Sequence, residues 1–334
     1  MNAADASSGP VFVVGMNGSG TTMLLDCLGR HPNLYAFPRE TRLIPYLMSR
    51  VKTFGDLQIE ANYRRLWDEV REVTVFRQEN GGSPVPIPQD WLNGPRSLAT
   101  VLDEVFSYFA SGAGKRRWCE KTPQHVQHLL ALAELFPAAK FIHVIRDGRD
   151  CAASFQRRWR RQPELTIFRW KKVVAIGRTQ GRQLGVGRYF EIRYEDLTAV
   201  PEDSLRDICK FLELSFDPAV LDSTQPYLQA AGDGGSRGLQ QNSGKWRTYF
   251  SPRMQRRLET IAGRTLAECG YETSYPQADA SVPGWQRRYW AGSEVVRQYG
   301  REIWRKLNGD LDRSWGVILA KPITALRQRH HNEY

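Results

Sequence analysis

The feature that most constrains the fold is a short apolar run that passes directly into a glycine-rich segment. The run covers residues 11–14, the glycine-rich segment is Gly15-Met16-Asn17-Gly18-Ser19-Gly20-Thr21-Thr22, and an apolar helical pattern follows at 23–28. This order is typical of a strand, a tight turn and a helix. Such a turn directs several backbone N–H groups at one point beside the positive end of a helix, where a phosphate group fits. The segment therefore predicts an α/β fold with an anion site.

The alternation of strands and helices continues along the chain. Predicted strands at 141–145 and 189–193 are followed by helical patterns that begin near Asp150 and after Pro201, and another helix is expected at 124–135. Strands that alternate with helices predict a parallel sheet covered on both faces. We expect a three-layer α/β sandwich of the P-loop nucleotide kinase type.

The remaining segments suggest how the domain is bounded. Residues 1–275 are expected to form the main domain, with a helical cap inserted at about 52–117 around a loop rich in proline and glycine at 79–95. Residues 276–334 form a basic C-terminal extension. An amphipathic helix there would pack on the domain, pack on a second copy of the chain, or lie on an anionic membrane. Its apolar positions are Trp285, Tyr289, Val296, Tyr299, Ile303 and Leu307, and a further apolar patch follows at 315–319.

Composition narrows the class of partner. The formal net charge of +11 favours an acidic partner, and the absence of a recognisable reader motif argues against nucleic acid. The five cysteines are widely spaced without a CxxC pair, which indicates reduced thiols rather than a disulfide or metal framework. No run reaches the roughly 18 to 20 apolar residues that span a bilayer, and the N-terminus lacks the pattern of a signal peptide. We expect a soluble, cytoplasmic protein.

The glycine-rich segment differs from a nucleoside triphosphate loop at one position. Its spacing matches GxxxxGK[ST], but Thr21 stands where that pattern requires lysine to reach the β- and γ-phosphates. An ATP-dependent small-molecule kinase is therefore disfavoured and is kept as an alternative. The segment is still expected to hold one phosphate, and its predicted ligands are Asn17, Gly18, Ser19, Gly20, Thr21 and Thr22.

A second anion site is predicted after the strand at 141–145. Arg146 follows this strand, and Ser154 and Arg158 lie one turn apart on one face of the next helix. Together they can surround a phosphate with charge-assisted hydrogen bonds, and the aspartates of the intervening DGRD sequence are expected to brace arginines. Two such sites at the carboxyl ends of neighbouring strands suit a nucleotide with phosphates on its 5′ and 3′ positions.

The two motifs resemble those with which sulfotransferases dependent on 3′-phosphoadenosine 5′-phosphosulfate (PAPS) bind the 5′-phosphosulfate and the 3′-phosphate. Further markers follow in that family's order over most of residues 11–270, and the segment that begins at Glu40 is similar to tyrosylprotein sulfotransferases, here of a bacterial type. The markers are Glu40-Thr41-Arg42-Leu43-Ile44-Pro45, Glu120-Lys121-Thr122-Pro123, Arg193-Tyr194-Glu195-Asp196-Leu197 and Ser243-Gly244-Lys245-Trp246.

The resemblance implies a sulfotransferase fold and the metal-free transfer of a sulfuryl group from PAPS to a hydroxyl of a peptide tyrosine, a sugar or a lipid. Glu40 follows a suggested strand at 34–37 and is the candidate base, or else a surface glutamate paired with Arg39 or Arg42. Arg42 would orient the acceptor. Lys121 would stabilise the transferring group, or else lie exposed at the surface.

Three further residues are expected near the donor. By resemblance, Tyr194 contacts it, or else its ring belongs to the core. Ser243 and Lys245, at the end of a glycine-rich stretch at 230–243, would close over it, or else the stretch is a structural connection.

The chain departs from the family at Gly18, where members commonly carry arginine or lysine. Asn17, Arg39 or Arg42 could supply the lost interaction with the sulfonate. Without such compensation, the chain would be an adaptor that binds the nucleotide but no longer catalyses transfer.

Overall fold

A computed structural model describes residues 9–222 and 242–307. The predicted apolar patch at 315–319 and most of the stretch at 230–243 lie outside the described residues. The described chain forms two compact units. Residues 9–146 and 173–222 with Asn242 form the first, and residues 147–172 and 243–307 form the second. The predicted division at residue 275 and the predicted cap stay predictions.

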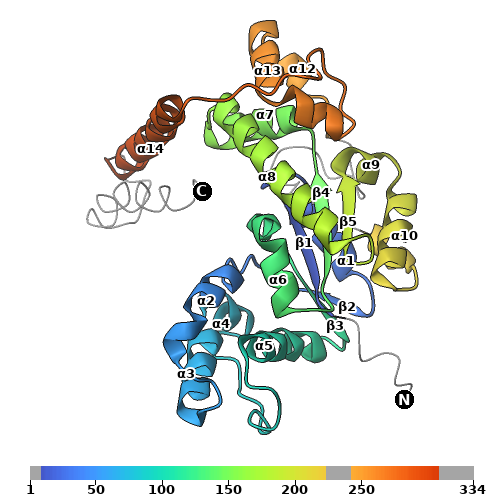
Figure 1. The fold of residues 1–334 in the computed structure, drawn as a ribbon, viewed down its shortest axis with the longest axis vertical. Helices are drawn as coiled ribbons and strands as arrows, with labels where there is room; N and C mark the ends of the chain where they lie inside the picture. The colour runs from blue at the N-terminus through green and yellow to red at the C-terminus, as the bar shows by residue number, and fades with distance from the viewer. Residues whose placement is uncertain (1–8, 223–241, 308–334) are drawn as a thin grey trace. The chain divides into compact units, whose positions relative to one another are not determined.

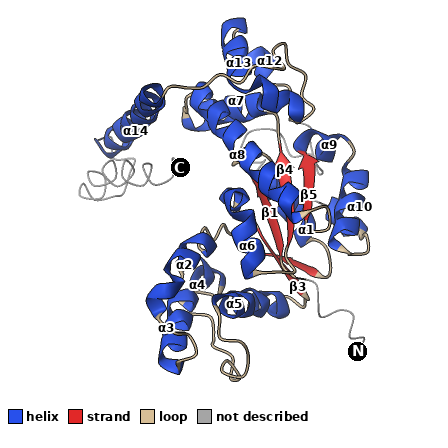
Figure 2. Ribbon diagram, in the orientation of Figure 1, coloured by secondary structure: helices blue, strands red, loops and turns tan. Residues whose placement is uncertain are grey.

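The first unit is built on a five-stranded parallel sheet (Figure 2). The strands lie in the order β2-β3-β1-β4-β5, and Val11 of β1 is in register with Cys119 on one side and Lys140 on the other. The strand order reverses beside β1, and in open α/β sheets ligands bind outside the carboxyl ends of the strands at such a point. The strands are β1 (Val11–Gly15), β2 (Leu34–Ala36), β3 (Arg117–Glu120), β4 (Lys140–Ile145) and β5 (Tyr189–Arg193).

Helices cover both faces of this sheet (Figure 1). Val11 and Val13 of β1 point to the face packed by α1 (Thr21–Gly29) and α10 (Pro201–Leu212). Phe12 and Val14 point to the opposite face, toward α5 (Leu98–Gly112) and α6 (Leu129–Leu135). This alternation follows from the two-residue period of a strand, and it confirms the predicted three-layer sandwich.

Phe12 lies at the centre of an aromatic core. Its ring centroid is 5.4 Å from that of Phe141 in a stacked arrangement and 5.6 Å from that of Trp118 edge-on. Helix α5 contributes apolar side chains at spacings of three and four residues, and Ser97 caps it by accepting a hydrogen bond from the Thr100 N–H. The core therefore fixes the strands whose ends carry the site.

Four helices lie between β2 and α5 and extend the same core. They contribute buried side chains such as Leu47, Trp67 and Phe76. The loop between the last of them and α5 confirms the predicted connection at 79–95. These helices are α2 (Ile44–Arg50), the 3-10 helix η1 (Val51–Phe54), α3 (Glu60–Arg71) and α4 (Thr74–Glu79).

Two connections of the first unit differ in detail from the predicted helices. The helix expected at 124–135 begins as the 3-10 helix η2 (Pro123–His128) and becomes α-helical only in α6. After β5 the short helix α9 (Tyr194–Ala199) comes before α10, which starts at Pro201 as predicted. The 3-10 helix η3 (Pro218–Leu221) follows α10.

The second unit is helical. It comprises α7 (Gly148–Trp159), the first part of α8 (Pro163–Leu184), α12 (Trp246–Tyr249), α13 (Pro252–Glu268) and α14 (Gly284–Leu307). At its centre the buried Arg149 guanidinium pairs with Asp147 at 2.8 Å and with Glu259 at 2.5 Å, and it stacks 3.8 Å from the Trp246 ring centroid.

The predicted C-terminal helix is present as α14. Its apolar residues Trp285, Tyr289 and Val296 are 71%, 68% and 70% exposed, so they are not buried against described residues. Among the helices that the structure describes, none combines the length and the apolar character needed to cross a bilayer.

Candidate active site

The predicted site residues of the first unit all follow the carboxyl ends of its parallel strands. The glycine-rich loop follows β1, Glu40 lies four residues beyond β2, Lys121 follows β3 directly, Arg146 follows β4, and Tyr194 follows β5. Because the carboxyl ends of parallel strands share one edge of a sheet, the topology gathers these side chains at that edge.

The loop after β1 has the geometry of an anion site. Gly18 and Gly20 adopt φ angles of 84° and 100°, which favour glycine. The N–H groups in the first turn of a helix have no partner within the helix. Helix α1 starts at Thr21, and no side chain caps these groups. These N–H groups and the helix dipole favour a bound phosphate.

Ser19 gives this loop an unsatisfied donor. Its side chain is 1% exposed, and its Oγ has no hydrogen-bond partner among the described residues. Its backbone N–H is already used, because it donates to the Met16 carbonyl oxygen at 3.0 Å. A buried hydroxyl without a partner is costly, and a phosphate oxygen would satisfy it. The hydroxyl of Ser19, rather than its backbone N–H, is therefore the group suited to the ligand.

Arg146 and Tyr194 lie against the same loop. The Arg146 Nη1 donates to the Gly18 carbonyl oxygen at 3.2 Å, and its Nη2 donates to the Asn242 carbonyl oxygen. Its guanidinium stacks 4.4 Å from the centroid of the Tyr194 ring. That ring in turn covers Gly20 so closely that a Cβ there would stand 2.5 Å from Tyr194 Cδ2. The loop, the guanidinium and the ring form one cluster.

Glu40 is held between two cations. Its Oε1 accepts from Lys121 Nζ at 2.8 Å, and its Oε2 accepts from Arg42 Nη2 at 2.6 Å. Lys121 is 6% exposed, which excludes the surface lysine considered from the sequence. Arg42 is the predicted partner of Glu40, whereas Arg39 stands 3.6 Å from Glu79.

The charge state of Glu40 follows from these contacts. Burial alone raises its pKa, but the hydrogen bonds and charges of Lys121 and Arg42 outweigh burial and leave the pKa below the ordinary value of 4.5. Glu40 is therefore ionised at neutral pH. An ionised carboxylate can accept a proton once its cations are engaged elsewhere.

The sequence did not show which buried residues support the Glu40–Lys121 pair. Glu120 belongs to a recognised motif, but the sequence did not reveal that its side chain is 0% exposed. No simple sequence signal reveals a buried carboxylate, because glutamate is mostly found at the surface.

The other predicted donor residues belong to the second unit. Ser154 and Arg158 lie one turn apart on α7, Ser243 is partly buried, and Lys245 is exposed immediately before α12. Their roles toward the donor stay predictions.

The DGRD aspartates have two different functions. Asp147 caps α7 and braces Arg149, as expected. Asp150 accepts from the backbone N–H groups of Gly244 at 2.7 Å and Trp246 at 2.9 Å, a contact that the sequence did not predict. This carboxylate ties the Ser243-Gly244-Lys245-Trp246 motif to α7 within the second unit.

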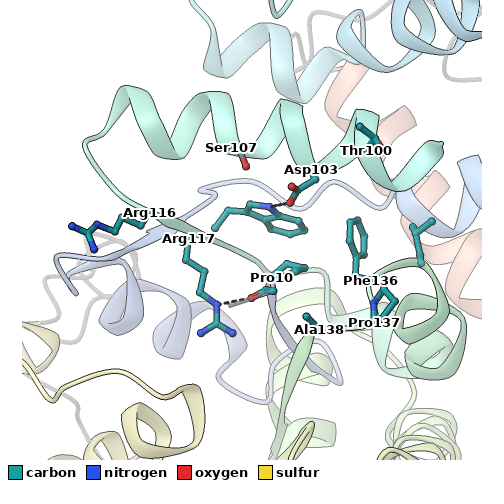
Figure 3. Close-up of a pocket in the computed structure, with 12 residues that line it drawn as sticks. Pro10, Thr100, Asp103, Ser107, Arg116, Arg117, Phe136, Pro137 and Ala138 are labelled. Carbon is teal, nitrogen blue, oxygen red and sulfur yellow. Dashed lines mark hydrogen bonds between the residues drawn. The ribbon is translucent and has the colours of Figure 1, made fainter. Parts of the chain in front are cut away.

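A cavity of about 580 Å³ lies at the opposite edge of the sheet (Figure 3). Its lining includes Pro10, Asp103, Arg117 and Trp118, and these residues surround the starts of β1 and β3. The Trp118 Nε1–H donates to Asp103 at 2.7 Å, and burial raises the pKa of that carboxyl. The cavity is separate from the candidate site, which lies at the carboxyl ends. Within the described part of the chain, no three His, Cys, Asp or Glu side chains are grouped to hold a metal ion.

Comparisons with known proteins identify the family of this chain. A protein-tyrosine sulfotransferase of Drosophila melanogaster is 28% identical over 221 residues, which cover 63% of this chain and 39% of the fly protein. Nodulation protein NoeE of Sinorhizobium fredii is 25% identical over 329 residues, covering 87% of this chain and 71% of that protein. The chain spans about half the length of several tyrosine sulfotransferases that it matches, such as 53% of a chicken protein.

The fold is similar to that of a solved structure. The sulfotransferase domain of the Synechococcus PCC 7002 olefin synthase superposes with a TM-score of 0.54 at 25% sequence identity, covering 79% of this chain and 95% of that domain. The sequence profile described as the sulfotransferase family matches residues 10–218, which is more than half of the chain. These residues include the loop after β1, the Glu40–Lys121 pair and Arg146. The chain therefore belongs to the sulfotransferase family.

Proposed function

We propose that this chain transfers the sulfuryl group of PAPS to the hydroxyl of an acceptor. The observation that carries the proposal is the Glu40–Lys121 pair at the sheet edge that also bears the phosphate loop. Family membership and the unsatisfied hydroxyl of Ser19 support it.

The donor would be held at both ends. The first turn of α1 and the Ser19 hydroxyl suit its 5′-phosphosulfate. Arg146, stacked on Tyr194, suits its 3′-phosphate, and the family motif extends that role to Ser154 and Arg158. We include Ser243 and Lys245 as donor contacts on the same resemblance.

The transfer itself requires two groups. As the acceptor oxygen attacks sulfur, a new S–O bond forms and the bond from sulfur to the 5′-phosphate oxygen breaks. Glu40 would take the proton of the acceptor hydroxyl. Lys121 would leave Glu40 and stabilise the charge that grows on the departing phosphate. Loss of that ion pair raises the proton affinity of Glu40 at the moment when a base is needed.

Gly18 occupies a position at which other family members commonly carry arginine or lysine. The two arginines considered as replacements are engaged elsewhere, Arg39 with Glu79 and Arg42 with Glu40. Arg146 donates to the Gly18 carbonyl oxygen, but its guanidinium is the one proposed for the 3′-phosphate, so it does not also replace a cation at the sulfonate. Asn17 is the remaining candidate for that interaction, and the transfer assay below distinguishes a competent enzyme from an adaptor that has lost catalysis.

The acceptor is proposed to be a peptide tyrosine, a sugar or a lipid, with the reaction in the cytoplasm. The proposal is tested by incubation with [35S]PAPS and a panel of tyrosyl peptides, oligosaccharides and hydroxylated lipids in EDTA. Label transferred to an acceptor and release of adenosine 3′,5′-bisphosphate are expected. Binding of this nucleotide without any transfer would point to the adaptor, and magnesium-dependent phosphorylation by ATP would point to the kinase.

Replacing Gly20 by Ala is expected to weaken binding of adenosine 3′,5′-bisphosphate about fivefold to hundredfold, the range set by a strained backbone at one residue. The added Cβ meets the Tyr194 ring at 2.5 Å, and φ at this position is 100°. Calorimetric titration measures the loss. Gly82→Ala is the matched control, because φ there is 91° but nothing lies within 4 Å of the new Cβ. Wild-type affinity in Gly20→Ala would exclude the loop as the nucleotide site.

A further inference from the structure

Glu120 connects the two segments that carry Glu40 and Lys121. It is the last residue of β3, and its side chain is fully buried. Its Oε1 accepts from the Thr41 hydroxyl at 3.0 Å, from the Thr41 N–H at 3.3 Å and from the Thr122 hydroxyl at 2.5 Å. One carboxylate oxygen thus gathers three donors from two loops.

The second oxygen of Glu120 lies beside a histidine but has no hydrogen-bond partner among the described residues. Its Oε2 lies 3.0 Å from His125 Nδ1, and the His125 ring, 1% exposed, packs edge-on 6.0 Å from Phe12. Burial raises the pKa of Glu120, but the neighbouring His125 and the hydrogen bonds from Thr122 and Thr41 lower it below its ordinary value. The carboxylate therefore stays ionised inside the core, where an unpaired charge would be strongly disfavoured.

The same network holds an unusual backbone conformation. Arg42 adopts a φ of 51°, which is uncommon for a residue other than glycine. Its N–H donates to Thr122 Oγ1 at 3.2 Å, and Thr122 in turn donates to Glu120. A strained residue persists only where its surroundings hold it in place. Here that conformation lets the Arg42 side chain turn back onto Glu40.

Each anchored residue is adjacent to a member of the catalytic pair. Thr41 follows Glu40, and Lys121 lies between Glu120 and Thr122. A shift of the 41–42 segment relative to the end of β3 would therefore separate the Glu40 carboxylate from the Lys121 ammonium. Displacements of about 1 Å at such a site can cost about a hundredfold in rate.

We propose that Glu120 is a positioning residue, whose buried carboxylate locks the Glu40 loop to the end of β3 and so sets the distance between the proposed base and Lys121. This inference rests on the proposed function for its catalytic consequence. Its structural part, the fixing of residues 40–42, can be measured without any turnover.

The test combines hydrogen exchange with kinetics on the full chain. In Glu120→Ala, the amides of Thr41 and Arg42 lose the network that protects them, so a peptide covering 38–44 should exchange at least about tenfold faster. The kcat for sulfuryl transfer should fall about tenfold to hundredfold. The KM for PAPS and the Kd for adenosine 3′,5′-bisphosphate should change less than about threefold, because the phosphate loop is untouched. Glu120→Gln retains an acceptor oxygen and should recover part of both losses.

Two further variants keep the test decisive. Asp103→Asn, an acid-to-amide change at the opposite edge of the sheet, should leave exchange at 38–44 and kcat unchanged. Should Glu120→Ala fail to fold, Thr122→Val removes the donor to Glu120 and the acceptor for Arg42, and it should reproduce both effects.

The outcomes separate the two proposals. Wild-type exchange at 38–44 in the Glu120 or Thr122 variants would overturn the positioning role, and so would faster exchange with an unchanged kcat. Absence of transfer by the wild type with every acceptor would count against the proposed function instead, and the exchange measurement would still decide whether Glu120 holds the loop.

Discussion

Glu40→Gln is expected to lower kcat for sulfuryl transfer by about 10²–10⁴-fold, the range that a positioned general base contributes. The amide has nearly the shape of the carboxylate but cannot take the acceptor's proton. Binding of adenosine 3′,5′-bisphosphate should be retained, because Glu40 contacts Lys121 and Arg42 and not the phosphate loop. Transfer of [35S]sulfuryl label and calorimetry measure the two quantities on the same preparation.

The control for this change is Glu202→Gln. Glu202 also pairs with an arginine, at 2.6 Å from Arg206, but it lies exposed in the first turn of α10. Its replacement should leave kcat unchanged. Unchanged turnover in Glu40→Gln would remove Glu40 from the mechanism, and a parallel loss of nucleotide affinity would indicate a disturbed fold rather than a missing base.

Lys121→Met is expected to reduce kcat by about 10²–10³-fold, as the loss of one donor to a developing oxyanion does elsewhere. Methionine keeps the length of the buried side chain and removes its charge. Lys121→Arg is the matched variant that keeps the charge, and it should retain more activity than Lys121→Met. Equal losses in both variants would show that packing at this buried position, and not its charge, determines the rate.

Lys121→Met should also change the pH dependence of kcat/KM. A base works in its deprotonated form, so kcat/KM falls as the pH drops through the pKa of Glu40. In the wild type Lys121 and Arg42 hold that pKa below 4.5, which places the acidic limb below this pH. Removal of Lys121 leaves burial opposed by Arg42 alone, and the limb of the residual activity should move to higher pH. A limb that does not move would mean that a different group titrates.

Much of the first unit could be predicted from the sequence because local and global signals agree there. The apolar run before the glycine-rich segment specified β1, the turn and α1, and the positions just beyond the other strands carried the polar motifs. Parallel topology then gathers these positions at one edge. The pairing of Glu40 with Arg42 was foreseen as the surface alternative, and the structure joins it to the pairing with Lys121.

The parts that could not be predicted depend on tertiary contacts. Arg117 and Glu120 are charged residues at the two ends of a four-residue strand. Both are buried, and each forms hydrogen bonds with a carbonyl oxygen or hydroxyl of a distant segment, although Arg117 Nη2 and Glu120 Oε2 have no partner among the described residues. The sequence does not reveal the positive φ of Arg42, because glycine is the residue that usually indicates such a conformation. The division into two units was also not visible, because it falls inside the continuous helix α8 and between Arg146 and Asp147.

The proposed function requires recognition of a nucleotide with phosphates at both its 5′ and 3′ positions. Calorimetric titration of the wild-type chain with adenosine 3′,5′-bisphosphate in EDTA, beside a titration with ATP and magnesium, tests this recognition without the acceptor. We expect saturable one-to-one binding of the bisphosphate that needs no metal, and much weaker binding of ATP. No heat with the bisphosphate, or tight binding that requires ATP and magnesium together, would contradict the proposed function.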